Sequence, residues 1–125
     1  MGLEFCVFMK NKETRRICFA CDLKDDQNLI NEYKKHHSPG AVWREVISSI
    51  KESGIVDMQI FCVENRLFMI IEVDNSFDAD LKTENDAKNP MVQEWEKLMW
   101  KYQQSIPGSP RGLKWVEMER IFELP

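Results

Sequence analysis

The segment IVDMQIFCVENRLFMIIEVD, residues 55–74, constrains the fold of this 125-residue chain more than any other stretch. β-Branched and aromatic residues occur throughout the segment, and they are typical of β-strands. Glu64 and Asn65 interrupt the apolar run and predict a tight turn. We therefore expect an antiparallel hairpin in the middle of the chain, around which the flanking segments pack.

The chain before the hairpin reads as a strand followed by a helix in two pieces. Residues 16–23 (RICFACDL) form the expected strand. Asp25 or Asp26 can cap a first helix over residues 27–37. The Ser38-Pro39 pair is typical of an N-cap and first turn, so it predicts a second helical piece over residues 41–53.

The chain after the hairpin reads as a helical region followed by a strand. Residues 75–88 are polar and predict a short helix or a loop. Asn89-Pro90 predicts the start of a long helix over residues 91–105. Residues 115–124 (WVEMERIFEL) are expected to form a closing strand.

The resulting order is strand, helix, strand, strand, helix, strand, which is that of the α+β ferredoxin-like split βαβ fold. Its helices cover one face of an antiparallel sheet, so the other face needs a separate cover. In small proteins of this kind a second copy commonly supplies it. We therefore expect a homodimer that forms a dimeric α+β barrel.

Length and charge limit the remaining possibilities. We expect one domain over residues 16–125, preceded by an N-terminal extension over residues 1–15. The net charge of -4 and the lack of a basic run argue against a nucleic-acid partner. No apolar run approaches the roughly 18 residues of a membrane span, and residues 1–15 do not resemble a signal peptide.

The four cysteines favour a cytoplasmic protein. Cys18 and Cys21 form a C-x-x-C pair, but it lies within an expected strand, where residues three apart point to opposite faces. A zinc site would need a second ligand pair, which the sequence does not supply. We expect reduced, buried thiols and no metal.

The only two histidines, His36 and His37, end the first expected helix. Leu29, Ile30 and Tyr33 define the apolar stripe of that helix, and His37 follows Tyr33 by one turn on the same stripe. His36 lies toward its edge. His37 is therefore either a partly buried histidine satisfied by a backbone carbonyl or a residue that acts in a site.

The expected long helix leaves a similar choice. Trp95 lies near the centre of its apolar stripe, with Glu96 on the flank. Such a stripe is usually core, and a glutamate on a helix flank is usually solvated. An aromatic ring beside a carboxylate also suits a sugar, whose C–H faces pack on rings while its hydroxyls need polar partners.

Five segments carry a resemblance that extends over residues 16–125: EYKKHHSP, ESGIVDMQIF, RLFMIIEVD, NPMVQEWEKLM and RIFELP. In these segments the chain resembles the L-rhamnose mutarotase family. The resemblance implies a dimeric ferredoxin-like protein that interconverts the α and β anomers of a 6-deoxy-L-hexose without metal or cofactor.

The resemblance also implies site residues. His37 matches the proton donor of the family, and Tyr33 and Trp95 match positions that contact the sugar. Two further sugar-contacting positions depart from the pattern, since Met58 replaces a tyrosine and Glu96 replaces a second tryptophan. These departures leave the reaction type intact and leave the identity of the sugar open. The sequence resembles the branch associated with L-fucose more than the rhamnose-type enzymes, so L-fucose is the expected substrate.

Ring opening of a sugar needs a proton donor and acceptor, and histidine can serve as both near neutral pH. Glu96 and Glu72 are candidates for a second proton relay. Two rival functions stay open at this point. One is a cofactorless monooxygenase or decarboxylase of the same fold, and the other is a sugar-binding module without catalysis.

Overall fold

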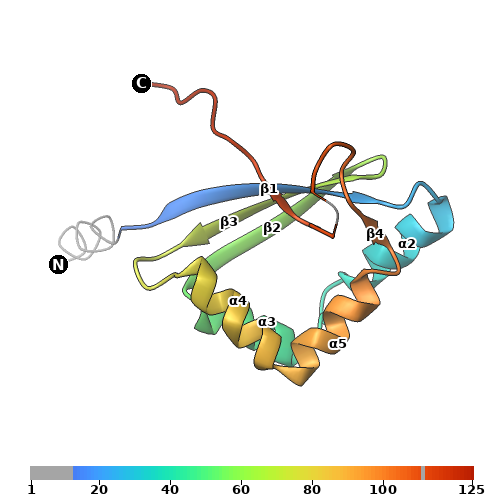
Figure 1. The fold of residues 1–125 in the computed structure, drawn as a ribbon, viewed down its shortest axis with the longest axis horizontal. Coiled ribbons are helices and arrows are strands. Elements are labelled where there is room, and N and C mark those ends of the chain that lie inside the picture. Colours follow the sequence, from blue (N-terminus) through green and yellow to red (C-terminus); the bar gives the residue numbers. More distant parts are fainter. Residues whose placement is uncertain (1–12, 111) are drawn as a thin grey trace.

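The computed structural model describes residues 13–110 and 112–125, and Figure 1 shows their arrangement. Its elements, in chain order, are β1 (Arg15–Leu23), α2 (Gln27–His36), α3 (Arg44–Glu52), β2 (Ile55–Val63), β3 (Arg66–Val73), α4 (Ala79–Lys88), α5 (Pro90–Met99), β4 (Gln103–Gln104) and β5 (Val116–Glu117). The expected N-terminal extension lies almost wholly outside the described residues. The central hairpin is confirmed, with Glu64 in its turn at a φ of 52°.

The sheet has the strand order β2-β3-β1-β4, and β5 pairs with β1 as well. Every pairing is antiparallel. The two long central strands, β1 and β3, pair from Arg15 opposite Val73 to Asp22 opposite Arg66. This order, with the helices on one side of the sheet (Figure 1), confirms the ferredoxin-like fold.

Side chains alternate between the two faces of β3, as the pleat of a strand requires. Leu67, Ile71 and Val73 are buried, and each belongs to a cluster of core residues. The larger cluster joins β1 and β3 to helices α2, α3 and α5 through Tyr33, Val46 and Trp95, among others. The helical face of the sheet therefore holds the core.

The helix α2 begins where its N-cap was expected. The carboxylate of Asp26 accepts from the backbone N–H groups of Asn28 and Leu29, at 2.9 and 3.1 Å. Such a cap satisfies N–H groups that the helix itself leaves unpaired. From this start α2 runs to His36 in its last turn, with His37 at its C-cap.

The prediction that Ser38 is the N-cap of the next helix was wrong. The Ser38 hydroxyl donates backwards to the carbonyl of Lys35 at 2.7 Å, and the Ser38 carbonyl accepts from the N–H of Ala41. Gly40 has a φ of 82°, which only a turn and not a helix accommodates. Helix α3 starts later, after Trp43, which supplies no side-chain cap.

The helix over residues 91–105 was also predicted too long. Helix α5 ends at Met99, and Gln103 and Gln104 instead pair with Leu23 and Asp22 of β1. Helical propensity cannot detect a distant strand that offers free backbone partners. The polar stretch before α5, for which helix and loop were both open, is helix α4, capped by Asp78.

The closing strand is much shorter than residues 115–124. Only Val116 and Glu117 pair with β1, and Met118 adds one N–H···O bond to Cys18 at 2.7 Å. The chain then leaves the sheet and ends as an extended arm (Figure 1). Three apolar side chains of this arm are 90%, 72% and 81% exposed: Ile121, Phe122 and Leu124.

The cysteines follow the strand pattern in part. Cys21 is buried opposite Leu67, whereas Cys18 is half-buried opposite Ile70 on the other face, so the pair cannot act together. The expectation of buried thiols in this pair is confirmed for Cys21 and only in part for Cys18, and Cys62 is exposed on the edge strand. Among the described residues, no helix combines the length and apolarity needed to cross a membrane.

Candidate active site

His37 lies at the C-cap of α2, one turn after Tyr33. The two rings are close, with centroids 4.3 Å apart and planes tilted by 33°. The Nδ1 atom of His37 lies 2.8 Å from the backbone carbonyl of Tyr33. The helix end therefore holds the imidazole in one orientation.

This contact decides which ring nitrogen of His37 carries hydrogen. A carbonyl oxygen can only accept, so Nδ1 donates, and in the neutral ring Nε2 keeps its lone pair. Burial lowers the pKa of His37 from its ordinary value of 6.5, and His36 lowers it further, while the bond to Tyr33 opposes the shift. At neutral pH the ring is therefore mostly neutral, with its lone pair on Nε2.

His36 points to other partners. Its Nε2 atom lies 3.1 Å from the hydroxyl of Tyr102, and its ring meets Trp95 edge-on at 6.4 Å. It does not line the cavities that His37 lines. The sequence reading, which set His37 on the inward stripe and His36 at its edge, agrees with this placement.

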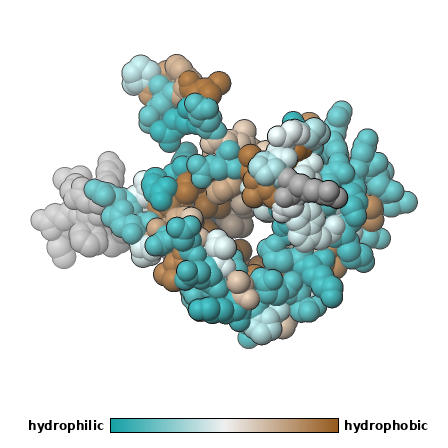
Figure 2. Space-filling model, viewed as in Figure 1, coloured by the Kyte–Doolittle hydropathy of each residue, from teal (hydrophilic) through white to brown (hydrophobic). Residues whose placement is uncertain are grey.

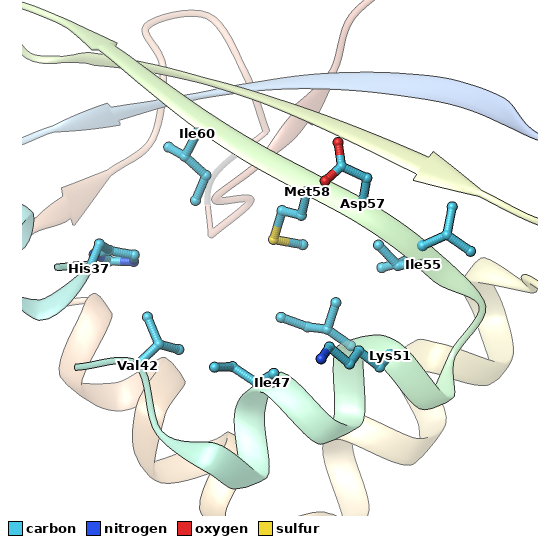
Figure 3. Close-up of a pocket in the computed structure, with 10 residues that line it drawn as sticks. His37, Val42, Ile47, Lys51, Ile55, Asp57, Met58 and Ile60 are labelled. Carbon is cyan, nitrogen blue, oxygen red and sulfur yellow. The ribbon is translucent and has the colours of Figure 1, made fainter. Parts of the chain in front are cut away.

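Two adjoining cavities lie between the helices and the sheet, and Figure 2 shows an opening there. The outer cavity, about 420 Å³, is mostly apolar (Figure 3). The inner cavity, about 260 Å³, is lined by more polar groups, among them Tyr33, Gln103 and the ion pairs Glu96–Lys114 and Asp86–Lys82. His37 and Met58 line both. The catalytic candidate thus lies at the junction of the two cavities.

Aromatic rings form one wall of the inner cavity. Trp95, on α5, is 6% exposed, and its ring centroid lies 5.6 Å from that of His37 and 5.2 Å from that of Trp43. Met58 lies on β2 and points into the outer cavity beside Ile60 (Figure 3). The structure therefore brings together His37, Tyr33, Trp95, Met58 and Glu96, all five predicted site residues.

The Tyr33 hydroxyl is fixed by Gln103. The amide Nε2 of Gln103 donates to this hydroxyl at 3.3 Å, and both residues are 3% exposed. Burial raises the pKa of Tyr33, so the phenol stays protonated. Because its oxygen accepts from Gln103, its own hydrogen is available to donate. Sequence reasoning missed Gln103 because it placed this residue inside a helix.

Glu96 forms an ion pair with Lys114, a residue that sequence reasoning also missed. The Glu96 side chain is 44% exposed and the Lys114 side chain only 11%. Lys114 comes from the loop before β5, in a stretch rich in Pro and Gly that has no periodic pattern. The contact is seen only in the structure, where this loop packs beside α5.

Glu72 is wrong as a relay candidate. It lies on β3 between the buried residues Ile71 and Val73, so its side chain points to the opposite face of the sheet. There it approaches Arg16 at 3.7 Å. It lines neither of the two cavities.

The described part of the chain contains no cluster of metal-binding side chains. No group of three or more His, Cys, Asp or Glu side chains there could hold an ion. The two histidines face different partners, Tyr102 and the Tyr33 carbonyl.

Comparison with known proteins identifies the family. The model of the L-rhamnose mutarotase family matches residues 16–124, and the chain belongs to this family. An L-fucose mutarotase of Xanthomonas campestris pv. campestris is 43% identical over 110 residues, which are 88% of each chain. A UPF0734 protein of Dictyostelium discoideum is 37% identical over 109 residues, 84% of this chain and 86% of the relative.

Solved structures agree with the fold. An L-rhamnose mutarotase from Formosa agariphila superposes with a TM-score of 0.63 at 25% identity, covering 89% of this chain and 99% of that one. The tetracenomycin F2 cyclase of Streptomyces glaucescens superposes with a TM-score of 0.55 over the same shares at 16% identity. This second likeness concerns the fold alone.

Proposed function

We propose that this protein is a mutarotase that interconverts the α and β anomers of a 6-deoxy-L-hexose. The observation that supports this most is His37, whose Nδ1 is held by the Tyr33 carbonyl while Nε2 is left for chemistry at the junction of the cavities. Membership of the L-rhamnose mutarotase family gives the reaction type.

The reaction needs only proton transfers. In the proposed mechanism, Nε2 of neutral His37 accepts the proton of the anomeric hydroxyl while the bond between C1 and the ring oxygen breaks. The ring oxygen takes up a proton, which the His37 imidazolium can return. Rotation about C1–C2 and closure in the reverse sense yield the other anomer. Acid–base help of this kind contributes typically about 10²–10⁴-fold.

The walls of the inner cavity have separate proposed roles. Trp95 packs against the C–H face of the sugar, and the Tyr33 hydroxyl, oriented by Gln103, donates to a sugar oxygen. Glu96, which is ionised in its pair with Lys114, accepts from a sugar hydroxyl. His37 is the catalytic residue, and Tyr33, Met58, Trp95 and Glu96 bind substrate.

L-Fucose is the proposed substrate, with L-rhamnose next. The relative named as an L-fucose mutarotase, at 43% identity, supports this choice. So does the composition of the cavity, in which Met58 lines the strand wall and Glu96 the helix wall. A carboxylate acceptor on the helix wall suits hydroxyl recognition on that side.

The active form is proposed to be a homodimer. The face of the sheet without helices exposes Phe61 by 52% and Val63 by 69%, and the C-terminal arm exposes Ile121, Phe122 and Leu124. Large apolar groups on an open sheet face mark an interaction surface. A second copy with the same face and arm would cover both in a symmetric dimer.

Two further expectations remain proposals. The protein is proposed to act in the cytoplasm, where reduced thiols such as Cys18 and Cys62 persist. Residues 16–125 are proposed as the mutarotase domain, with residues 1–15 as an extension outside it.

Saturation-transfer NMR at the anomeric protons tests the function directly. L-Fucose, L-rhamnose, D-ribose and D-galactose are compared with and without protein at equal concentration. Transfer between the α and β signals, above the spontaneous rate, is expected for L-fucose first. Line broadening without transfer would instead indicate a sugar-binding module. The absence of both would contradict the proposal and reopen the monooxygenase or decarboxylase alternative, which the comparisons do not favour.

A further inference from the structure

The Lys114 ammonium is an unusual charge for so enclosed a position. Its side chain is 11% exposed and lines the inner cavity. An ammonium has three N–H donors, and a buried charge is costly unless those donors find acceptors. Among the described residues, its hydrogen-bond acceptor is Glu96 Oε2, and the Trp100 ring lies 5.3 Å from Nζ.

The pair of Lys114 and Glu96 offers two kinds of partner side by side. The ammonium donates only, and the carboxylate accepts only. A sugar hydroxyl donates one hydrogen bond and accepts others, so two neighbouring ring hydroxyls can bond both charged groups at once. Hydrogen bonds to charged groups are stronger than those between neutral groups. An ion pair in this place is therefore suited to recognise vicinal hydroxyls.

A purely structural role for the pair is the simple alternative. The ion pair joins the loop before β5 to α5 across 18 residues, which could hold the loop in place. Exposed ion pairs contribute little to stability, but Lys114 is largely buried, so this rule does not decide the matter here. Glu96 is exposed enough to remain solvated without Lys114, whereas Lys114 extends its charge into the cavity. A structural tether does not require that the lysine be buried, whereas contact with a ligand in the cavity does.

We propose that Lys114 binds substrate together with Glu96, and that the two charges read adjacent ring hydroxyls and so select the sugar. This inference rests on the proposed mutarotase function, and it adds Lys114 to the residues proposed to bind the sugar. If Lys114 binds one particular ring hydroxyl, a sugar that lacks this hydroxyl makes no bond to the ammonium. Removal of the ammonium should then slow the exchange of L-fucose but not of that deoxy sugar.

The test uses Lys114→Met, which keeps most of the unbranched apolar stem of the side chain but removes the ammonium. Lys101→Met is the matched control, because Lys101 also lies over an aromatic ring, 5.8 Å from the centroid of Tyr102, but is exposed and lines neither cavity. Anomer exchange is measured by NMR for L-fucose and for its 2-deoxy, 3-deoxy and 4-deoxy derivatives. Thermal unfolding of each variant checks that it is folded.

For L-fucose, kcat/KM should fall about tenfold to a hundredfold in Lys114→Met and stay within twofold in Lys101→Met. For one of the three deoxy sugars, the wild type and Lys114→Met should exchange at equal rates. Lys114→Arg, which keeps a charged donor, should recover part of the loss.

Two results would overturn the inference. One is an unchanged kcat/KM for L-fucose in Lys114→Met, and the other is an equal loss for all three deoxy sugars. Failure of both Lys114→Met and Lys114→Arg to fold would assign the pair a structural role and overturn it as well. If the wild type exchanges no sugar, the mutarotase proposal fails, whatever the role of Lys114. Saturation-transfer difference NMR then tests binding alone. Weaker L-fucose binding by Lys114→Met than by Lys101→Met would still support the binding role of Lys114.

Discussion

The two faces of the same sheet differ in how far one chain completes them. On the helical face, Leu67 and Ile71 are 1% and 3% exposed beneath the helices. On the open face, Phe61 and Val63 of the neighbouring strand are 52% and 69% exposed. Both faces carry apolar side chains, so hydrophobic pattern alone does not distinguish them. The helical face holds the candidate site, and the open face is the proposed surface for assembly.

The largest expected effect lies on the helical face and separates the two histidines. His37→Ala should reduce the enzymatic part of anomer exchange about 10²–10⁴-fold, because it removes the proposed acid–base group at the cavity junction. His36→Ala should change the rate less than about threefold, since its ring is bonded to Tyr102 and lines neither cavity. NMR exchange rates for both variants measure the difference. Equal losses would show that position on the inward stripe does not define the acid.

The next effect concerns the open face. Phe61→Asp should raise the dimer dissociation constant about thirtyfold or more, because it places a charge within the proposed apolar interface. Leu81→Asp is the control, since Leu81 is 51% exposed but belongs to α4, in the helical layer. Light scattering during size-exclusion chromatography gives the mass of each variant across a dilution series. A wild-type protein that is monomeric at all concentrations would refute the assembly role of this face.

A smaller effect is expected from exchanging the two departures from the family pattern. Met58→Tyr combined with Glu96→Trp should shift the ratio of L-fucose to L-rhamnose exchange about tenfold toward L-rhamnose. The strand wall gains a phenolic hydroxyl while the helix wall loses an acceptor, and unpaired polar groups penalise a sugar that cannot use them. Rates for both sugars with both proteins measure the ratio. An unchanged ratio would mean that these two positions do not select the sugar.

The pH dependence should follow the depressed pKa of His37. In the unfolded chain this histidine protonates near pH 6.5, and in the folded protein only at lower pH. Between these two values the unfolded state binds more protons, so the His37 contribution to stability is lost as pH falls through that range. Exchange that needs neutral His37 should likewise stay level from pH 8 to 6.5 and decline below. Urea unfolding and NMR rates of wild type and His37→Gln, which lacks both steps, test this.

The smallest effect is expected from a chelator. Dialysis against EDTA should change neither the unfolding temperature nor the exchange rate, because His36 and His37 face different partners and cannot share one ion with good geometry. Circular dichroism and NMR exchange before and after dialysis measure both quantities. Activity that is lost on dialysis and restored by zinc would contradict this expectation.

Much of the fold could be predicted because its signals are local. The hairpin over residues 55–74, the Asp26 cap and the Asn89-Pro90 helix start depend on residues within a few positions of one another. The end of α5 could not be predicted in this way. Gln103 and Gln104 have no sequence signal for a strand, and they leave the helix because β1 offers them backbone partners.

The same distinction between local and distant signals applies to the candidate site. Tyr33 and His37 are one helical turn apart, so the 3.6-residue period alone places them together on the inward face of α2. Their proposed roles came from resemblance to the family, since periodicity does not distinguish a buried histidine from a catalytic one. The bond from Nδ1 to the Tyr33 carbonyl reconciles the two readings, because it satisfies one nitrogen and leaves the other free.

The sequence by itself determined the order of elements, the inward position of His37 and Trp95, and the family. Each of these follows from spacing along the chain or from similarity to other chains. Only the tertiary structure decided that Gln103 meets Tyr33 across 70 residues, that Lys114 meets Glu96, and that Glu72 points away from the site. Contacts of this kind depend on how distant segments pack, and backbone pairing and side-chain burial over the whole fold outweigh what any local stretch encodes.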